Sequence, residues 1–288
     1  IFFSKDVIAT ILSFVFVFIF IGIAELLRHK KLLGTSTTRK IIHIGVSHWW
    51  LFAMLFIDSI QAAIVGPLVF IVLNALSIKF QLFKGMDEHS STRNLGTVYF
   101  PISLFVLVVL AWSGIMPKWV AGTGILVMGW GDGLAALLGE KIKSPAGKVF
   151  GGRKSLAGTS TMAIASGLVV LIFILVFDQN AIFTAALYRA LGTALVAAFL
   201  ETATPFGIDN ITVPLGTAFY FYYISALPLN GTLVIGFIFA GSFAYIAWYR
   251  NLVSCEGALA GLGTALLILA SSGVNGLIIL FAFFISSS

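Results

Sequence analysis

The sequence predicts an all-α, polytopic integral membrane protein with about nine to eleven transmembrane helices. Apolar residues make up 59% of its 288 residues, charged residues make up only 10%, and the mean hydropathy is +1.07. A soluble globular domain is roughly one-quarter charged, so no separate water-soluble domain is expected. The apolar runs are about as long as a spanning helix requires, roughly 20 residues, and they lack the alternation of an outer-membrane barrel.

The hydropathy pattern divides the chain into apolar segments separated by short polar loops. The predicted spans are residues 7–27, 41–57, 59–78, 95–113, 118–139, 157–177, 182–203, 214–228 and 231–249. A last segment, 256–285, is interrupted by Ser271-Ser272-Gly273. At about 1.5 Å per residue it is long for one straight span and short for two, so we expect a tight hairpin or a broken helix. We therefore divide the chain into a membrane domain, 1–252, and an apolar helical tail, 253–288.

Basic residues gather on one side of the membrane when these spans are threaded in alternating directions. One side receives fourteen of the 17 Lys and Arg residues: Arg28, Lys30, Lys31, Arg39, Lys40, Lys79, Lys84, Arg93, Lys141, Lys143, Lys148, Arg153, Lys154 and Arg250. The other side receives Lys5, Lys118 and Arg189. Because cytoplasmic loops carry an excess of Lys and Arg, the N-terminus is predicted to be external and the basic loops cytoplasmic. The net charge of +6 suits contact with anionic lipids of the bilayer.

The sequence argues against a disulfide, a Cys-based zinc site and a nucleic-acid-binding module. The single Cys255 cannot form an internal disulfide or a Cys-based zinc site. No loop is long enough to hold a module that reads nucleic acid, so nucleic acid is not an expected partner.

One carboxylate lies inside the otherwise apolar span 118–139. Asp132 is flanked by Gly129, Gly131 and Gly133. An unpaired carboxylate in hydrocarbon is expensive, so Asp132 needs a cation, a metal ion or water, and the glycines let a backbone or a ligand approach closely. The alternative is an aspartate that pairs with a neighbouring helix and only fixes its packing.

A second polar cluster precedes the span 157–177. It comprises Gly151, Gly152, Arg153, Lys154, Ser155, Gly158 and Thr159. Free backbone N–H groups at the start of a helix favour anions, and Arg and Lys add charge-assisted hydrogen bonds to phosphate oxygens. The spacing of a Walker A loop is absent. The alternative is a basic loop that only sets topology.

A third cluster opens the second span. Arg39 and His43 are four residues apart and therefore share a helix face, with Lys40 beside them. This face can point at an anion at the membrane mouth, or its cations can simply extend to the membrane interface.

The fourth cluster surrounds a Pro/Gly break near the end of the span 182–203. It contains Glu201, Asp209 and Asn210, whose oxygen atoms are hard ligands suited to Mg²⁺. Asp87, Glu88 and His89 are weaker candidates because they lie in a plain hydrophilic loop. The four clusters fall on the predicted cytoplasmic side, which favours a site for a phosphorylated ligand with a divalent metal ion.

Taken in this order, the clusters resemble the polyprenol kinase family of membrane proteins, which contains dolichol kinase, phytol kinase and a CTP-dependent diacylglycerol kinase. The likeness is carried by Arg39-Lys40-x-x-His43, Gly131-Asp132 with Ala135 and Gly139, Gly152-Arg153-Lys154-Ser155-x-x-Gly158-Thr159, and Glu201…Pro205-x-Gly207-x-Asp209-Asn210-x-x-x-Pro214. It covers roughly residues 35–250, and the compact length is similar to phytol kinase. The tail, with Gly257-Ala258-Leu259-Ala260-Gly261, resembles the opening of a second membrane family that includes phytyl-phosphate kinases.

The resemblance implies transfer of a phosphate from CTP to the hydroxyl of a phytol-like membrane isoprenoid alcohol, with Mg²⁺ as cofactor. Asp132, Glu201 and Asp209 would hold Mg²⁺ or take the alcohol proton. The residues expected to bind the nucleotide and its phosphates are Arg39, Lys40, His43, Gly131, Gly152, Arg153, Lys154, Ser155, Gly158, Thr159 and Asn210. The rival interpretation is a transporter or permease for a small anionic or phosphorylated solute, although the charges cluster at one face and no inverted repeat is apparent.

Overall fold

The computed structural model describes residues 4–80, 95–149, 152–204, 207–226 and 231–286. Its elements, in chain order, are α1 (Lys5–His29), α2 (Thr35–Ser47), α3 (Trp49–Phe56), α4 (Ile60–Ala63), α5 (Val65–Phe80), α6 (Gly96–Trp112), α7 (Lys118–Val127), the π-helix η1 (Met128–Asp132), α8 (Gly133–Lys141), β1 (Ala146–Val149), β2 (Gly152–Ser155), α9 (Leu156–Phe177), α10 (Phe183–Ala203), α11 (Asp209–Ala226), α12 (Gly231–Tyr249) and α13 (Cys255–Ser286). The predicted all-α class is therefore confirmed, with one small β-hairpin added.

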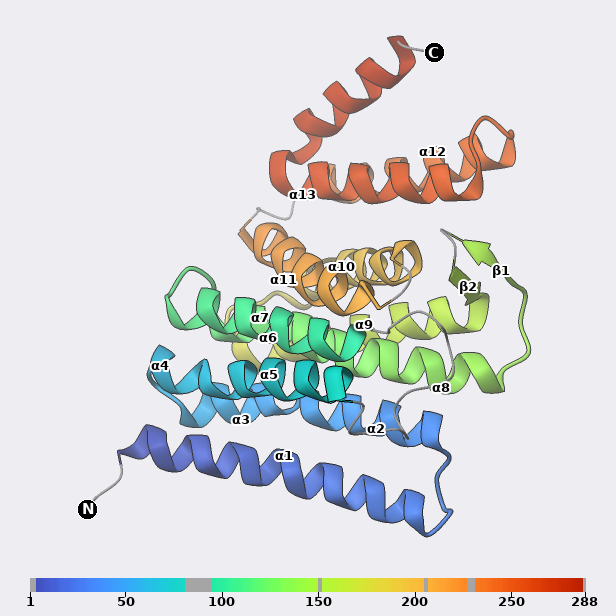
Figure 1. Cartoon of the computed structure of the whole chain (residues 1–288). Coiled ribbons are helices and arrows are strands. Elements are labelled where there is room, and N and C mark those ends of the chain that lie inside the picture. Colours follow the sequence, from blue (N-terminus) through green and yellow to red (C-terminus); the bar gives the residue numbers. More distant parts are fainter. Residues whose placement is uncertain (1–3, 81–94, 150–151, 205–206, 227–230, 287–288) are drawn as a thin grey trace.

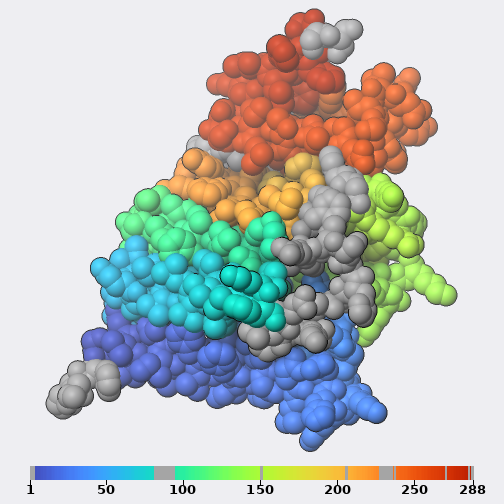
Figure 2. All heavy atoms as spheres, in the orientation of Figure 1, coloured from blue at the N-terminus to red at the C-terminus, as the bar shows by residue number. Residues whose placement is uncertain are grey.

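The helices are stacked beside one another largely in sequence order (Figure 1). α1 forms one end of the stack, and α12 and α13 form the other. The space-filling view shows the same order as bands of colour, from the first helix to the last (Figure 2). Local helix pairs such as α9 with α10 and α12 with α13 make many of the contacts.

Five described segments are long and apolar enough to cross a membrane, judged by length and composition. They are Lys5–His29, Ile60–Phe80, Lys118–Lys141, Leu156–Phe177 and Phe183–Ala203. Each coincides with a predicted span within a few residues. Gly96–Trp112 is a shorter apolar helix that matches the predicted span 95–113.

The predicted span 41–57 is two helices rather than one. α2 ends at Ser47 and α3 begins at Trp49. At the junction, the backbone N–H of His48 donates to the Gly45 carbonyl rather than to the Ile44 carbonyl, which instead contacts Nδ1 of the His48 ring at 2.8 Å. The Ser47 hydroxyl also donates to the Ile44 carbonyl at 2.6 Å, so two side chains contact this carbonyl in place of the backbone N–H of His48.

The helix that contains the predicted span 214–228 begins before it, because α11 begins at Asp209. Pro214 lies inside this helix and has no N–H to donate to the carbonyl four residues earlier, that of Asn210. The hydroxyl of Ser103 on α6 donates to this carbonyl at 2.7 Å. A side chain from a neighbouring helix therefore satisfies the acceptor that proline leaves free.

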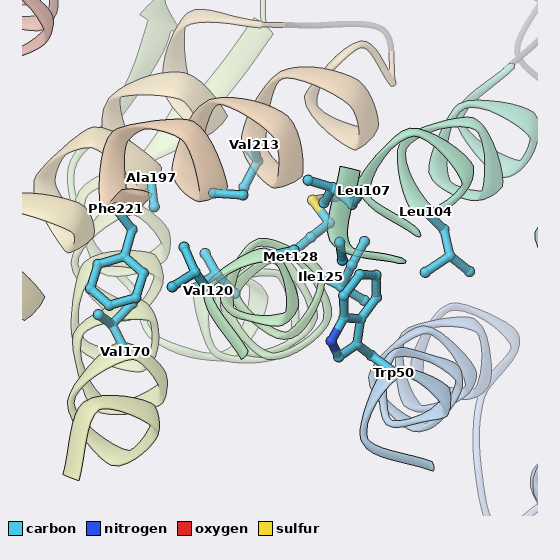
Figure 3. Close-up of a cluster of buried hydrophobic side chains, with 14 of the residues drawn as sticks. Trp50, Leu104, Leu107, Val120, Ile125, Met128, Val170, Ala197, Val213 and Phe221 are labelled. Carbon is cyan, nitrogen blue, oxygen red and sulfur yellow. The ribbon is translucent and has the colours of Figure 1, made fainter. Parts of the chain in front are cut away.

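The core is centred on α7, which α6, α9 and α11 surround (Figure 3). Of the apolar window in Lys118–Lys141, 72% of residues are buried, against 22% for α1. Small residues permit this packing: a Cβ added to Gly124 would lie 2.2 Å from the Pro214 carbonyl oxygen, and one added to Gly122 would lie 2.4 Å from Nε1 of Trp50. Close backbone approach is the usual basis of helix association in membranes.

The β-hairpin lies between α8 and α9, where the sequence indicated only a basic loop. β1 and β2 are antiparallel, and Lys148 faces Arg153 in the register. Val149 is the only β-branched or aromatic residue in the two strands, so their sequences favour a strand only weakly. The hairpin is closed at its base by the N–H of Leu156, which donates to the Pro145 carbonyl at 2.9 Å.

The apolar tail forms a broken helix, one of the two predicted outcomes. Within α13, Gly273 has φ 65° and ψ −161°, so the helix bends there. Glycine tolerates this positive φ because it has no Cβ. α12 and α13 share a small apolar cluster that contains Ala240, Leu269 and Leu277. The division of the chain at residue 252 stays a prediction.

Candidate active site

Asp132 is positioned by the π-helical segment η1 between α7 and α8. Such segments are rare and occur often at functional sites. The three flanking glycines face other helices: an added Cβ would lie 2.2 Å from Oγ of Ser47 at Gly129, 2.5 Å from Sδ of Met162 at Gly131, and 2.4 Å from a carbon of Ile44 at Gly133. These glycines therefore let α2 and α9 approach η1, and this close packing fixes the backbone that carries Asp132.

A cavity of about 460 Å³ lies beside Asp132. It is bounded by α8, the hairpin, the start of α9 and the end of α10. Its lining residues are Asp132, Ala135, Ala136, Gly139, Glu140, Ile142, Lys143, Ser144, Ala146, Arg153, Lys154, Ser155, Gly158, Thr159 and Glu201. The structure thus brings Arg153, Lys154, Ser155, Gly158 and Thr159 of the second cluster into one cavity with two of the three predicted carboxylates.

Each of these two carboxylates is paired with a lysine from another element. Nζ of Lys40 on α2 lies 3.3 Å from Oδ2 of Asp132. Lys154 on β2 forms an ion pair with Glu201 on α10. The four side chains are between 10% and 21% exposed, whereas the pair Lys5–Asp58 at the opposite end of the helices is 65% and 70% exposed. Water therefore screens the cavity pairs much less than a surface pair.

Asp209 lies near the same carboxylates, at the first residue of α11 and before the predicted span. The pKa of Asp209 is raised to about 6, mainly by burial and also by the negative charge of Asp132, while the positive charge of Lys154 opposes the rise. Asp209 is not a lining residue of the cavity, but the charges of Asp132, Lys154 and Glu201 in the cavity affect its pKa.

The start of α9 differs from the expected anion site. Its first three backbone N–H groups already have acceptors: that of Leu156 donates to Pro145, that of Ala157 to Oγ of Ser144, and that of Gly158 to Oγ of Ser155. The expectation of free N–H groups for phosphate was therefore wrong. The cationic side chains that this segment contributes to the cavity are those of Arg153 and Lys154.

Gly139 and Gly158 form the close crossing of α8 and α9 at the cavity wall. A Cβ added to Gly139 would lie 3.2 Å from the Cα of Gly158 and 3.2 Å from Oγ of Ser155. Oγ1 of Thr159 lies 3.5 Å from Oγ1 of Thr202 on α10. These contacts hold three elements of the wall together.

Several predicted site residues do not line the cavity. Arg39 is half-buried on α2, and Gly152 lies at the start of β2. The ring of His43 packs edge-on against Phe100 at 4.7 Å, and its Nε2 atom is buried. Asn210 donates from its side chain to the Gly207 carbonyl and to Asp209.

The structure adds lining residues that the sequence analysis did not select. Glu140, Lys143 and Ser144 lie at the end of the cavity formed by the C-terminus of α8 and the following turn. A helical pattern could have identified Glu140, because it is eight residues after Asp132 and shares its side of the helix with Ala136 and Gly139. The loop Asp87–His89 lies outside the described residues.

The carboxylates fit Mg²⁺ that is bound together with a phosphorylated ligand. Among the described residues, no group of three or more His, Cys, Asp and Glu side chains is arranged to hold a metal ion by itself. Magnesium is usually held by one or two carboxylates and by substrate phosphates. Asp132 and Glu201 supply two carboxylates to one cavity, and Arg153 and Lys154 supply cations for phosphate.

Comparison with known proteins identifies the family of the chain. No protein-family model and no solved structure matches the chain. The chain is 37% identical over 201 residues to a phytol kinase of Synechocystis sp., a match that covers 68% of this chain and 82% of the relative. It is 26% identical to probable chloroplastic phytol kinases of Glycine max and Triticum aestivum, over 74% and 67% of this chain and 74% and 69% of those proteins. The chain therefore belongs to the phytol kinase group of the polyprenol kinase family and is a kinase that acts on an isoprenoid alcohol.

Proposed function

We propose that this kinase transfers the terminal phosphate of CTP to the hydroxyl of phytol or a closely similar isoprenoid alcohol, with Mg²⁺, at the cytoplasmic membrane face. The observation that carries the proposal is the shared cavity of Asp132, Glu201, Arg153 and Lys154. Phosphoryl transfer depends mainly on positioning and on neutralising the charge of the phosphates. A cavity with two carboxylates and two cations meets both requirements.

The cations bind the nucleotide phosphates in this proposal. Arg153 and Lys154 donate charge-assisted hydrogen bonds to phosphate oxygens. Lys154 is paired with Glu201 and Lys40 is paired with Asp132 in the structure. Binding of a triphosphate gives both lysines new anionic partners and frees the two carboxylates for the metal ion or the alcohol.

The carboxylates act at the reacting end of the nucleotide. The alcohol oxygen forms a bond to the terminal phosphorus, the bond from that phosphorus to the bridging oxygen breaks, and CDP leaves with this electron pair. A carboxylate among Asp132, Glu201 and Asp209 takes the hydroxyl proton, and the others hold Mg²⁺. When bound, Mg²⁺ neutralises charge on the phosphate oxygens.

The position of the cavity suits a membrane-bound alcohol. Ile142 and Leu156, beside it, are 50% and 62% exposed, and Ala135, Ala136 and Ala146 line it. An isoprenoid tail in the bilayer can therefore reach the cavity with its hydroxyl leading. Clustered charge at one end of the helices fits this arrangement better than a midplane transport site.

The test is transfer of labelled phosphate from CTP to phytol by the purified protein with Mg²⁺. We expect labelled phytyl phosphate. Asp132→Asn should lower turnover by about 10²–10⁴-fold if Asp132 takes the proton, and it should raise the Mg²⁺ requirement if Asp132 is a ligand. Asp58→Asn is the matched control because Asp58 is exposed and lies at the opposite end of the helices. If the folded protein transfers no phosphate from CTP to phytol, the proposed reaction is contradicted. If folded Asp132→Asn has normal turnover, the proposed role of Asp132 is contradicted.

A further inference from the structure

One face of α8 lines the cavity over its whole length. Asp132, Ala135, Ala136, Gly139 and Glu140 are all lining residues, and their spacing is that of a single helical face. Ala135, Ala136 and Gly139 in the middle have short side chains, so they leave room for a ligand against the helix backbone. A charged residue stands at each end of this strip.

Glu140 stands at the end of the strip far from Asp132. Glu140 is eight positions after Asp132, which corresponds to about 12 Å along a helix at 1.5 Å per residue. This separation is similar to that between the terminal phosphate and the base of an extended nucleoside triphosphate. A nucleotide with its terminal phosphate beside Asp132 can therefore place its base beside Glu140.

Glu140 has no ion-pair partner among the residues that the structure describes, although it is surrounded by basic sequence. Its side chain is exposed. Lys143 and Ser144 line the same end of the cavity, and Oγ of Ser144 is already used as an acceptor for α9. Among the described residues, none donates to the Glu140 side chain, so this carboxylate is an acceptor available to a ligand.

We propose that Glu140 selects the base of the nucleotide donor by accepting a hydrogen bond from the exocyclic amine of cytosine. This inference rests on the proposed use of a nucleoside triphosphate. An ionised carboxylate only accepts hydrogen bonds. Cytosine presents its N4 amine as a donor, whereas a uracil-type base presents the O4 acceptor at that position. A carboxylate here therefore favours CTP over UTP, and Lys143 can donate to the remaining acceptors of the base.

The experiment compares nucleotide binding to the full-length protein in detergent, with and without the charge at position 140. We expect the parent to bind CTP at least about tenfold more tightly than UTP, the factor typical of one hydrogen bond to a charged group. Glu140→Gln carries an amide that can also donate to O4, so the ratio of the two affinities should fall toward one. Glu140→Asp keeps the charge and should retain part of the preference. Glu25→Gln, in the pair with Arg28 on α1, is the matched control and should leave the ratio unchanged.

The outcomes separate this inference from the proposed function. An equal CTP-to-UTP ratio in the parent and in Glu140→Gln overturns the inference, and so does a parent that binds both nucleotides equally. The assay of phosphate transfer to phytol is run on the same preparations. A preference for CTP that depends on Glu140 without transfer to phytol supports base selection and refutes only the proposed reaction. Transfer to phytol with an unchanged ratio supports the reaction and refutes base selection.

Discussion

Lys40 and Asp132 form a half-buried ion pair across two helices, with Nζ 3.3 Å from Oδ2, although they are 92 residues apart in the sequence. The pair connects α2 to η1 at the mouth of the cavity. Each side chain is only about one-fifth exposed, so water solvates each charge poorly. The opposite charge of the partner compensates for this loss of solvation. The pair therefore explains how a carboxylate is tolerated in the predicted span, and it holds the carboxylate in place before substrate binds.

The coupling between these two residues is measurable by a double-mutant cycle. We expect Lys40→Gln and Asp132→Asn to show a coupling free energy within the range of about 0.5–3 kcal/mol found for residues in contact. The same cycle on Lys5 and Asp58 is the control, since an exposed pair typically contributes about 0.2–1 kcal/mol. Unfolding in detergent provides the free energies. A coupling at the cavity no larger than that of the exposed pair would show that Lys40 does not hold Asp132.

Nucleotide affinity should depend on the cations of β2. Arg153→Ala and Lys154→Ala each remove hydrogen bonds between a charged group and phosphate, worth about 1.5–3 kcal/mol or roughly ten- to hundredfold in affinity. Lys141→Ala is the control, because Lys141 is exposed and does not line the cavity. Binding of labelled CTP checks this prediction. If all three variants bind CTP as the parent does, the basic segment serves only topology.

Stability should depend on pH through Asp209. The pKa of Asp209 is raised to about 6 from its ordinary value of 3.8, mainly by burial, so between these values the folded protein holds a proton that the unfolded chain releases. The contribution of Asp209 to stability therefore decreases as pH rises from about 4 to about 6, and the full penalty is present above about 6. Asp209→Asn should consequently gain stability relative to the parent between pH 5 and pH 7.5, as measured by thermal unfolding without metal. Asp58→Asn is the control. A difference between parent and Asp209→Asn that is independent of pH would refute this assignment.

Close helix packing makes a specific demand at Gly124. Alanine there would place a Cβ 2.2 Å from the Pro214 carbonyl oxygen, which is backbone and cannot rotate away. We expect Gly124→Ala to lose about 1–3 kcal/mol of stability, the usual effect of overpacking. Gly22→Ala on α1 is the matched control, because no atom lies within 4 Å of its added Cβ and alanine favours a helix by roughly 0.5–1 kcal/mol. Thermal unfolding of the two variants should shift in opposite directions, and equal shifts would mean that the crossing of α7 and α11 is looser than described.

The charge asymmetry predicts which end of the helices faces the cytoplasm. With Cys255 replaced by Ser, a cysteine at Lys148 in β1 should react only with reagents that reach the cytoplasmic side. A cysteine at Ser113, which is exposed near Lys118, should react from the external side. Labelling of intact cells with an impermeant maleimide tests both positions. Labelling of Lys148→Cys from outside would place the cavity on the external face and refute the proposed topology.

The sequence by itself determined where the chain is helical and which end of each helix is charged. Hydropathy over about 20 residues is a local property, so segments such as Lys118–Lys141 and Leu156–Phe177 coincide with their predictions. The break at Gly273 was also visible locally, because glycine interrupts an apolar run that is too long for one span. Boundaries failed where another part of the chain decides them. Ser103 lets α11 continue through Pro214, and no local pattern in residues 209–214 contains that information.

Only the tertiary structure decided which polar residues share a site. Lys40, Asp132, Lys154 and Glu201 come from four separate segments, and their pairing depends on how α2, η1, β2 and α10 pack. The same packing turned His43 inward against Phe100, and it used the N–H groups at the start of α9 within the protein. The helical period places Glu140 on the same side of the helix as Asp132, but only the packing shows that this side faces a cavity. Sequence patterns report the period of one helix, whereas a site is formed by contacts between helices, which depend on side-chain shapes that are distant along the chain.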